Sequence, residues 1–297
     1  MPEDNLKLKE IKPALCGYIS EAQLMLNPGV LPDEKVIHDV RVLMKRSRAS
    51  IRLLRSQIDE ESFNKEYLTF REVGRIMCTW RENSVHRKLI KDLKKRFPEL
   101  FSRLKDNEKI NLLLGKQQIL NEPSPEMKEG LEKIIGLLHK SGFRLRFRSM
   151  NSLDQKLITG ELEKTFDNVS SCFLKARNYN KKVNLHEFRK KTKDFLYQLT
   201  FFRSLDPKAI KSLEKRIEAI GQNLGKYNDY AVLIKSLGYT YPSGENSSAI
   251  DELIVIIKQE QDRYLLKVWP FAFRIFRPGK KLANLSGFKV PVINPMV

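Results

Sequence analysis

Basic side chains recur at helical spacing in residues 36–55, VIHDVRVLMKRSRASIRLLR. Six of these twenty residues are Lys or Arg, and Asp39 is the one acid among them. Arginine presents a fork of N–H donors that matches the oxygens of a phosphate or carboxylate, and lysine adds a mobile positive charge. The chemistry that this segment offers is therefore the recognition of an anion.

A helical projection sorts these cations into one basic stripe. At about 100° per residue, a sector roughly 100° wide holds most of them, with apolar residues such as Val40 and Leu43 beside it, where a core would lie. The stripe is about 25 Å long at 1.5 Å rise per residue. Its members are His38, Arg41, Lys45, Arg48, Arg52 and Arg55, and Arg46 lies off the main sector.

Like charges one turn apart repel each other, so the stripe is destabilising unless an anion offsets it. A solvated helix face is the alternative interpretation, but such faces usually interleave acids for i,i+4 pairing, and this stripe has none. An extended row of cations suits a linear polyanion, whose binding releases counterions and weakens with salt. The histidine at the head of the stripe could donate a hydrogen bond to phosphate or hold a neighbouring helix, and both roles are open.

A second copy of the segment follows at a constant offset. LHEFRKKTKDFLYQLTFF (185–202) aligns with residues 37–54 at an offset of 148, which is His186 minus His38. The matched pairs are His38 with His186, Arg41 with Arg189, Lys45 with Lys193, and Arg55 with Arg203. Residues 73–85 match 220–232 at an offset of 147, with Gly74 on Gly221. Two matches at nearly one offset predict a tandem duplication with a period near half the chain.

The elements that must position these residues are helices, because apolar residues recur with helical period along most of the chain. We expect an all-α fold of two antiparallel helical bundles, about four main helices each, over residues 1–150 and 151–276, with a C-terminal tail over 277–297. The helices expected in the first bundle cover roughly 6–26, 32–58, 61–83, 84–97, 99–120 and 125–140. The alternating FRLRFR (143–148) is interpreted as a frayed helix end or a connector.

Charge and composition narrow the class of partner. The 297 residues carry a net charge of +19, with a pI near 9.7, and 41% are hydrophobic. A core is therefore expected, together with a polyanionic partner: nucleic acid, an anionic membrane surface or a phosphate-rich polymer. Cys16, Cys78 and Cys172 form no metal or redox pattern, which is typical of a reducing compartment. No secretory signal or membrane-length apolar run is visible, so the expected location is the cytoplasm.

The two motifs resemble the signatures of the CHAD family, the conserved-histidine α-helical domain. The first signature is matched by His38, Arg41, Val42, Lys45, Arg46, Arg48 and Arg52. The second is matched by Leu185, His186, Glu187, Phe188, Arg189, Lys190, Lys191, Lys193 and Tyr197. TWRENSV and LGKYNDYAV are similar to two further stretches of the family. Asp194 and Leu196 stand where the second signature often has Arg, so we expect the first half to contribute more to binding.

The resemblance implies two bundles related by pseudo-two-fold symmetry, with a basic groove or pore between them. It also implies binding of inorganic polyphosphate and association with polyphosphate granules. Neither catalysis nor a cofactor is expected, because no P-loop, Gly-x-Ser-x-Gly or HExxH pattern is present. The candidate polyphosphate-binding residues are His38, Arg41, Lys45, Arg46, Arg48, Arg52, Arg55, His186, Arg189, Lys190, Lys193 and Arg203.

Three alternatives compete with this interpretation. Nucleic-acid backbone binding uses the same cations, although base stacking would want exposed aromatic residues along the stripe. Anionic membrane binding would want free apolar residues, and these are expected in the core. An enzyme of the triphosphate tunnel type would need E-x-E-x-K on a strand, and the nearest string is ELEKT (161–165) in a helical context. No catalytic or metal-ligating set is expected.

Overall fold

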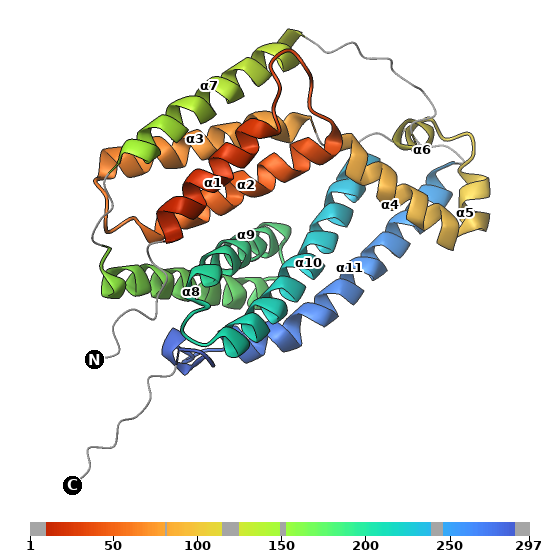
Figure 1. The fold of residues 1–297 in the computed structure, drawn as a ribbon. Coiled ribbons are helices and arrows are strands. Elements are labelled where there is room, and N and C mark those ends of the chain that lie inside the picture. The colour runs from red at the N-terminus through yellow and green to blue at the C-terminus, as the bar shows by residue number, and fades with distance from the viewer. Residues whose placement is uncertain (1–9, 81, 115–124, 149–152, 239–245, 289–297) are drawn as a thin grey trace.

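The computed structural model describes residues 10–80, 82–114, 125–148, 153–238 and 246–288. These residues form eleven α-helices and no strand, which confirms the predicted all-α class (Figure 1). The helices are α1 (Ile11–Leu24), α2 (Glu34–Leu53), α3 (Glu60–Thr79), α4 (Glu82–Arg96), α5 (Pro98–Arg103), α6 (Glu108–Leu113), α7 (Pro125–Phe147), α8 (Gln155–Asn178), α9 (Lys182–Leu199), α10 (Pro207–Gly238) and α11 (Asn246–Phe276). Short 3₁₀ turns follow α9 and α11.

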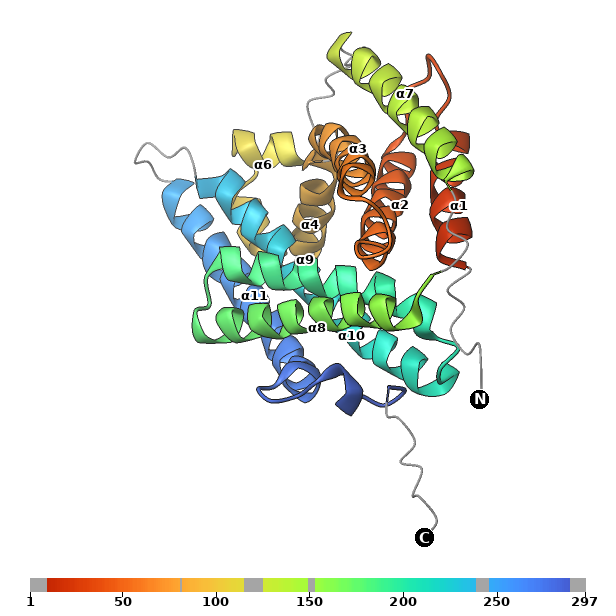
Figure 2. The same cartoon turned by 90° about the vertical axis from the view of Figure 1, so that its left-hand side faces the viewer.

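The helices form two groups that meet where α2 packs against α8 and α9. In one group α2 contacts α1 and α3, and α7 covers both of those helices. In the other, α8, α9, α10 and α11 pack in sequence, and α8 also contacts α11. Figures 1 and 2 show the groups as two layers, with the α4–α6 segment beside α10 and α11. The contact between α2 and α9 brings together the two segments that carry the basic signatures.

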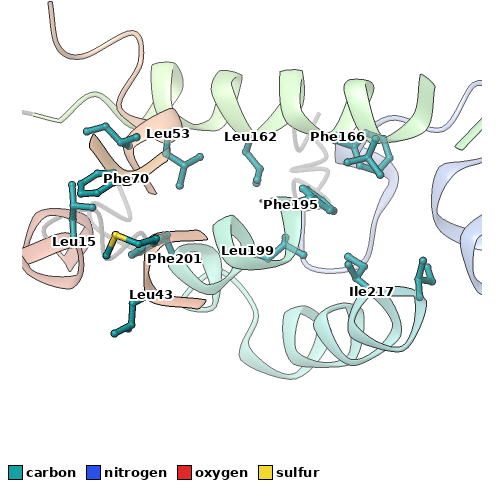
Figure 3. Packing of buried hydrophobic residues seen from close by; sticks show 14 of the residues in the cluster. Leu15, Leu43, Leu53, Phe70, Leu162, Phe166, Phe195, Leu199, Phe201 and Ile217 are labelled. Carbon is teal, nitrogen blue, oxygen red and sulfur yellow. The ribbon is translucent and has the colours of Figure 1, made fainter. Parts of the chain in front are cut away.

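A single apolar core runs through both groups. Leu15, Leu43 and Phe70 belong to the same buried cluster as Phe166 and Phe195 (Figure 3). Phe276 lies near the middle of the aromatic part of this cluster, with its ring centroid 5.7 Å from that of Phe166 and 6.3 Å from that of Phe195. The predicted boundary near residue 150 therefore does not separate two cores. The division into two repeats stays an interpretation of the sequence.

A second, smaller core joins α4–α6 to the other end of α10 and α11. It contains Ile90, Leu93 and Leu104 from the first segment, and Leu233 and Ile257 from the second, all at most 1% exposed. We expected residues 84–120 to complete the first bundle. The apolar faces of α4–α6 instead pack on helices of the second half, because α10 and α11 extend past α8 and α9 and offer an apolar surface there.

Helix ends differ from the predicted ones for identifiable reasons. α2 begins after Asp33, whose side chain accepts a hydrogen bond from Val36 N at 2.7 Å, and it ends at Leu53 rather than near 58. α7 continues into FRLRFR as far as Phe147, because Leu145 reaches the core and Arg144 binds the carboxylate of Glu66 at 2.5 Å. The expected helix over 99–120 is two short helices, α5 and α6, joined by residues 104–107, and residues 115–120 lie outside the described residues.

The first part of the predicted tail belongs to the fold. Leu282 and Leu285 are at most 4% exposed, and the ring of Phe288 lies 5.9 Å from that of Phe202. Gly287 has φ of +93°, and a Cβ there would lie 2.9 Å from a side-chain carbon of Ile210, so the tight approach to α10 requires glycine. The segment after α11 therefore closes one end of the main core.

Candidate anion-binding site

The contact between α2 and α9 is held by polar groups as well as by the core. Gln198 on α9 donates from Nε2 to the carbonyl oxygen of Ala49 on α2 at 3.0 Å. Arg52 Nη1 lies 2.6 Å from Asp194 Oδ2, with both side chains mostly buried. These contacts span more than 140 residues of sequence and set the basic stripe of α2 beside α9.

On the side of α2 that faces α3, Arg48 and Arg52 lie near the side chain of Tyr67. Arg52 donates from Nη2 to Tyr67 Oη at 2.7 Å, and its guanidinium lies 5.0 Å from the centre of that ring. Burial lowers the pKa of the Arg48 guanidinium below its usual value, and the charge of Asp194 opposes this shift. Arg52 and Arg71 add to the lowering, so like charges gather here. Tyr67 and Arg71 were missed at the sequence level.

Several guanidinium nitrogens of these helices are out of water without a hydrogen-bond acceptor among the described residues. They are Nε and Nη1 of Arg41, Nε of Arg48 and Nε of Arg189. Buried donors are normally paired, and a charged donor without an acceptor is costly. An anion that enters between the helices would supply the missing oxygens. This is the structural feature that a solvated basic face does not have.

Two glycines of α10 allow the second basic segment, which is α9, to pack closely against α10. A Cβ on Gly221 would lie 3.2 Å from Cε of Lys193, and one on Gly225 would lie 3.4 Å from Nε of Arg189. The absence of side chains there lets both cations lie along the surface of α10. Burial, followed by the charge of Arg189, lowers the pKa of the Lys193 ammonium below 10.5, and Glu218 opposes this shift.

Arg46 connects the two segments, although the helical projection places it off the main sector of its own helix. Its guanidinium is 5.9 Å from the ring centres of both Tyr18 on α1 and Tyr197 on α9. Its charge also contributes to the lowered pKa of Lys193. Arg46, Arg189 and Lys193 therefore form a second cationic group, on the α9 and α10 side of the site.

Three of the predicted binding residues, Arg55, Arg203 and Lys190, form ion pairs with nearby carboxylates. Arg55 follows the end of α2 and pairs with Glu60 at 3.0 Å, with its guanidinium 4.2 Å from the Phe63 ring centre. Arg203 follows α9 and pairs with Glu214 at 2.8 Å, and Lys190 pairs with Glu187 at 3.1 Å. The helices end before Arg55 and Arg203, so the predicted stripes are shorter than the projection indicated.

The two histidines lie on exposed positions near the starts of α2 and α9. His186 places Nδ1 3.2 Å from Oδ1 of Asn228 on α10, so a contact with a neighbouring helix exists, although the ring is not buried. His38 is exposed as well, and Lys45, the third member of the stripe, is half-buried. Within the described ranges, no group of three or more His, Cys, Asp or Glu side chains is placed to hold a metal ion, and no helix could span a bilayer.

The fold and the paired segments define an all-α domain in which two basic helices, from distant parts of the chain, pack against each other. The comparison with protein families agrees with this class: the model of the CHAD domain matches residues 19–238. The match covers most of the chain, including α2, α3, α9 and α10, and the chain therefore belongs to the CHAD family. A comparison with curated proteins finds no match. The last long helix, α11, lies beyond the matched residues.

Proposed function

We propose that this protein binds inorganic polyphosphate, as a linear polyanion, and does so without catalysing its breakdown or synthesis. The observation that supports this most directly is the set of buried guanidinium donors on α2 and α9, at Arg41, Arg48 and Arg189, that have no acceptor in the described part of the chain. A chain of phosphates presents oxygens at short, regular intervals and can satisfy several such donors in sequence. Membership in the CHAD family supports the same ligand.

Nucleic-acid backbone binding is the competing proposal, because it uses the same cations. Base stacking on this site would require free aromatic faces. The rings of Tyr18, Tyr67 and Tyr197 instead lie next to the guanidinium groups of Arg46 and Arg52. This arrangement favours a ligand that needs cations only, and it favours polyphosphate over single-stranded nucleic acid.

A competition experiment tests the choice. Long-chain polyphosphate and duplex or single-stranded DNA, at equal phosphate concentration, compete for the protein at several salt concentrations, with binding followed by anisotropy of labelled DNA. Polyphosphate should displace DNA at moderate salt and bind more tightly in direct titration. Equal or weaker binding of polyphosphate would contradict the proposal. Unchanged polyphosphate chain length after incubation, seen on a gel, is the expected result for a protein that is not a hydrolase.

Association with polyphosphate granules would follow from such binding. A fluorescent fusion of the full chain should move with granules stained for polyphosphate, and a variant with Arg41 and Arg48 neutralised should not. Retention of the variant on granules would mean that another surface directs it there.

A further inference from the structure

Asp194 places a carboxylate among the cations of the other helix. It is 8% exposed, and its Oδ2 lies 2.6 Å from Nη1 of Arg52. The charges that act on nearby Arg48 come from this carboxylate and from Arg52 and Arg71. A carboxylate presents two oxygens to a guanidinium much as a phosphate does. In this part of the site, α9 thus supplies an anion of its own.

This carboxylate divides the basic stripe into two unlike parts. Arg52 already has two oxygen partners, Asp194 and the hydroxyl of Tyr67. Arg41, the first arginine of the stripe, has two buried nitrogens without an acceptor among the described residues, and Arg48 and Arg55 have one each. A ligand that extends along the stripe from Arg41 would contact the donors of Arg41 and Arg48, which have no acceptor among the described residues, before it reaches Arg52, which is already paired. It would also meet the negative charge of Asp194.

We propose that Asp194 is an internal competitor that occupies the place of a ligand phosphate at Arg52 and thereby limits the affinity of the site. The inference rests on the proposed binding of polyphosphate. The polyanion either displaces the carboxylate from Arg52 or leaves that arginine uncontacted, and both outcomes weaken binding relative to a site without the acid. The residue thus determines how strongly, and over what length, the stripe holds its ligand.

A purely structural role for Asp194 makes a different prediction. Gln198, one turn further along α9, already links α9 to the backbone of Ala49. A buried ion pair is by itself a weak stabiliser of a fold, because desolvation offsets the attraction. Asp194→Asn keeps the shape and an amide oxygen that Arg52 can bind, but it removes the charge. The variant therefore separates competition with the ligand from attachment of the two helices.

The test compares Asp194→Asn with Asp167→Asn, an exposed position on α8 that changes the net charge equally. Polyphosphate affinity of the full chain is measured by titration over a range of salt. Asp194→Asn should bind about tenfold more tightly than Asp167→Asn, because a neutral amide competes for Arg52 less strongly than a carboxylate does. Its plot of log K against log salt should be steeper by roughly one unit. Circular dichroism verifies folding, and Asp194→Ser serves as a second neutral variant.

Arg52→Gln in both backgrounds completes the test. Its loss of affinity should be larger when Asp194 is neutralised than when the carboxylate is present. Equal affinity of Asp194→Asn and Asp167→Asn, together with equal losses from Arg52→Gln, would overturn the inference. Failure of the proposed function has a different signature: the wild-type chain would then bind polyphosphate no better than Arg41→Gln does.

Discussion

At the scale of single residues, the site is distinguished by how its cations are solvated. Arg41, Arg48 and Arg189 each hold at least one guanidinium nitrogen out of water without an acceptor among the described residues, whereas Lys94 and Lys95 on α4 are exposed. Charge in water is screened and contributes little to specific binding, and charge at a desolvated position contributes more. The position of a cation thus matters more here than the net charge of +19.

Neutralising Arg41 and Arg48 together should therefore remove most of the binding. Arg41→Gln with Arg48→Gln is expected to weaken polyphosphate binding roughly 100-fold, because two charge-assisted contacts are lost. Lys94→Gln with Lys95→Gln removes the same charge from an exposed surface and should change affinity less than about threefold. Titration of both double variants at one salt concentration checks this. Equal losses would indicate diffuse attraction rather than a site.

Lys193 should couple binding to pH. Burial and the neighbouring Arg189 lower the pKa of its ammonium below 10.5 in the free protein. A bound anion favours the charged form and raises this pKa again. Binding at a pH between the lowered pKa of the free protein and the higher pKa of the complex should therefore take up a proton, and affinity should fall as the pH rises through that window.

Calorimetry in two buffers of different ionisation enthalpy measures this proton uptake. The uptake should disappear in Lys193→Gln and persist in Lys190→Gln, since Lys190 pairs with Glu187 on its own helix. Uptake that is the same in both variants would assign the titration to another group.

At the scale of elements, the surface of α10 decides where the second group of cations lies. Gly221 and Gly225 leave room for Lys193 and Arg189 along the helix. Glycine within a helix is unfavourable by roughly 1 kcal/mol relative to alanine, so these positions sacrifice local stability. In α3, Gly74 aligns with Gly221 at the offset of 147, and no atom lies within 4 Å of a Cβ there. The two glycines are thus equivalent in the sequence and different in their surroundings.

Gly221→Leu should displace the end of the Lys193 side chain and weaken polyphosphate binding about as much as Lys193→Gln does. Gly74→Leu extends into open space and should leave binding unchanged, with both variants gaining helix propensity. Affinity and thermal unfolding of the two variants, measured in parallel, check the prediction. Binding equally affected at both positions would mean that the space beside Lys193 has no role.

At the scale of the whole molecule, the helix beyond the family match completes the core on which the site rests. Phe276 of α11 is fully buried, and its ring lies 6.0 Å from that of Phe188 on α9 and 6.5 Å from that of Phe173 on α8. The apolar side of α9 therefore packs on α11, while its basic side faces α2 and α10. Loss of this packing should loosen the helix that carries Arg189 and Lys193.

Phe276→Ala is expected to lower the free energy of unfolding by about 3–5 kcal/mol, since it opens a cavity among aromatic rings. Phe271→Ala, on the exposed side of the same helix, should change it by less than about 0.5 kcal/mol. Denaturant unfolding of both variants measures the difference. Equal, small effects would show that α11 is not part of the cooperative core.

The sequence alone was sufficient to predict the all-α class and the basic segments, because these follow from local spacing. The resemblance of the two signatures was sufficient to predict the family. The 3.6-residue period identifies α2 and α9, and the repeated H-x-x-R pattern identifies the signature. Arg46 was also predicted to lie off the stripe, from the helical projection. Helix ends were predicted less well, since the end of α2 at Leu53 and the extension of α7 to Phe147 depend on what each segment packs against.

The tertiary structure decided which cations are buried, which are paired and which remain open to a ligand. The pairing of Arg52 with Asp194 joins residues 142 positions apart, so no local pattern could reveal it. No local pattern could reveal the contact of Lys193 with Gly221 either, or the packing of α4–α6 on α10 and α11. Local spacing determines which side chains share a helix face. The solvation and the partners of those side chains depend on surfaces that the chain brings together only when it folds.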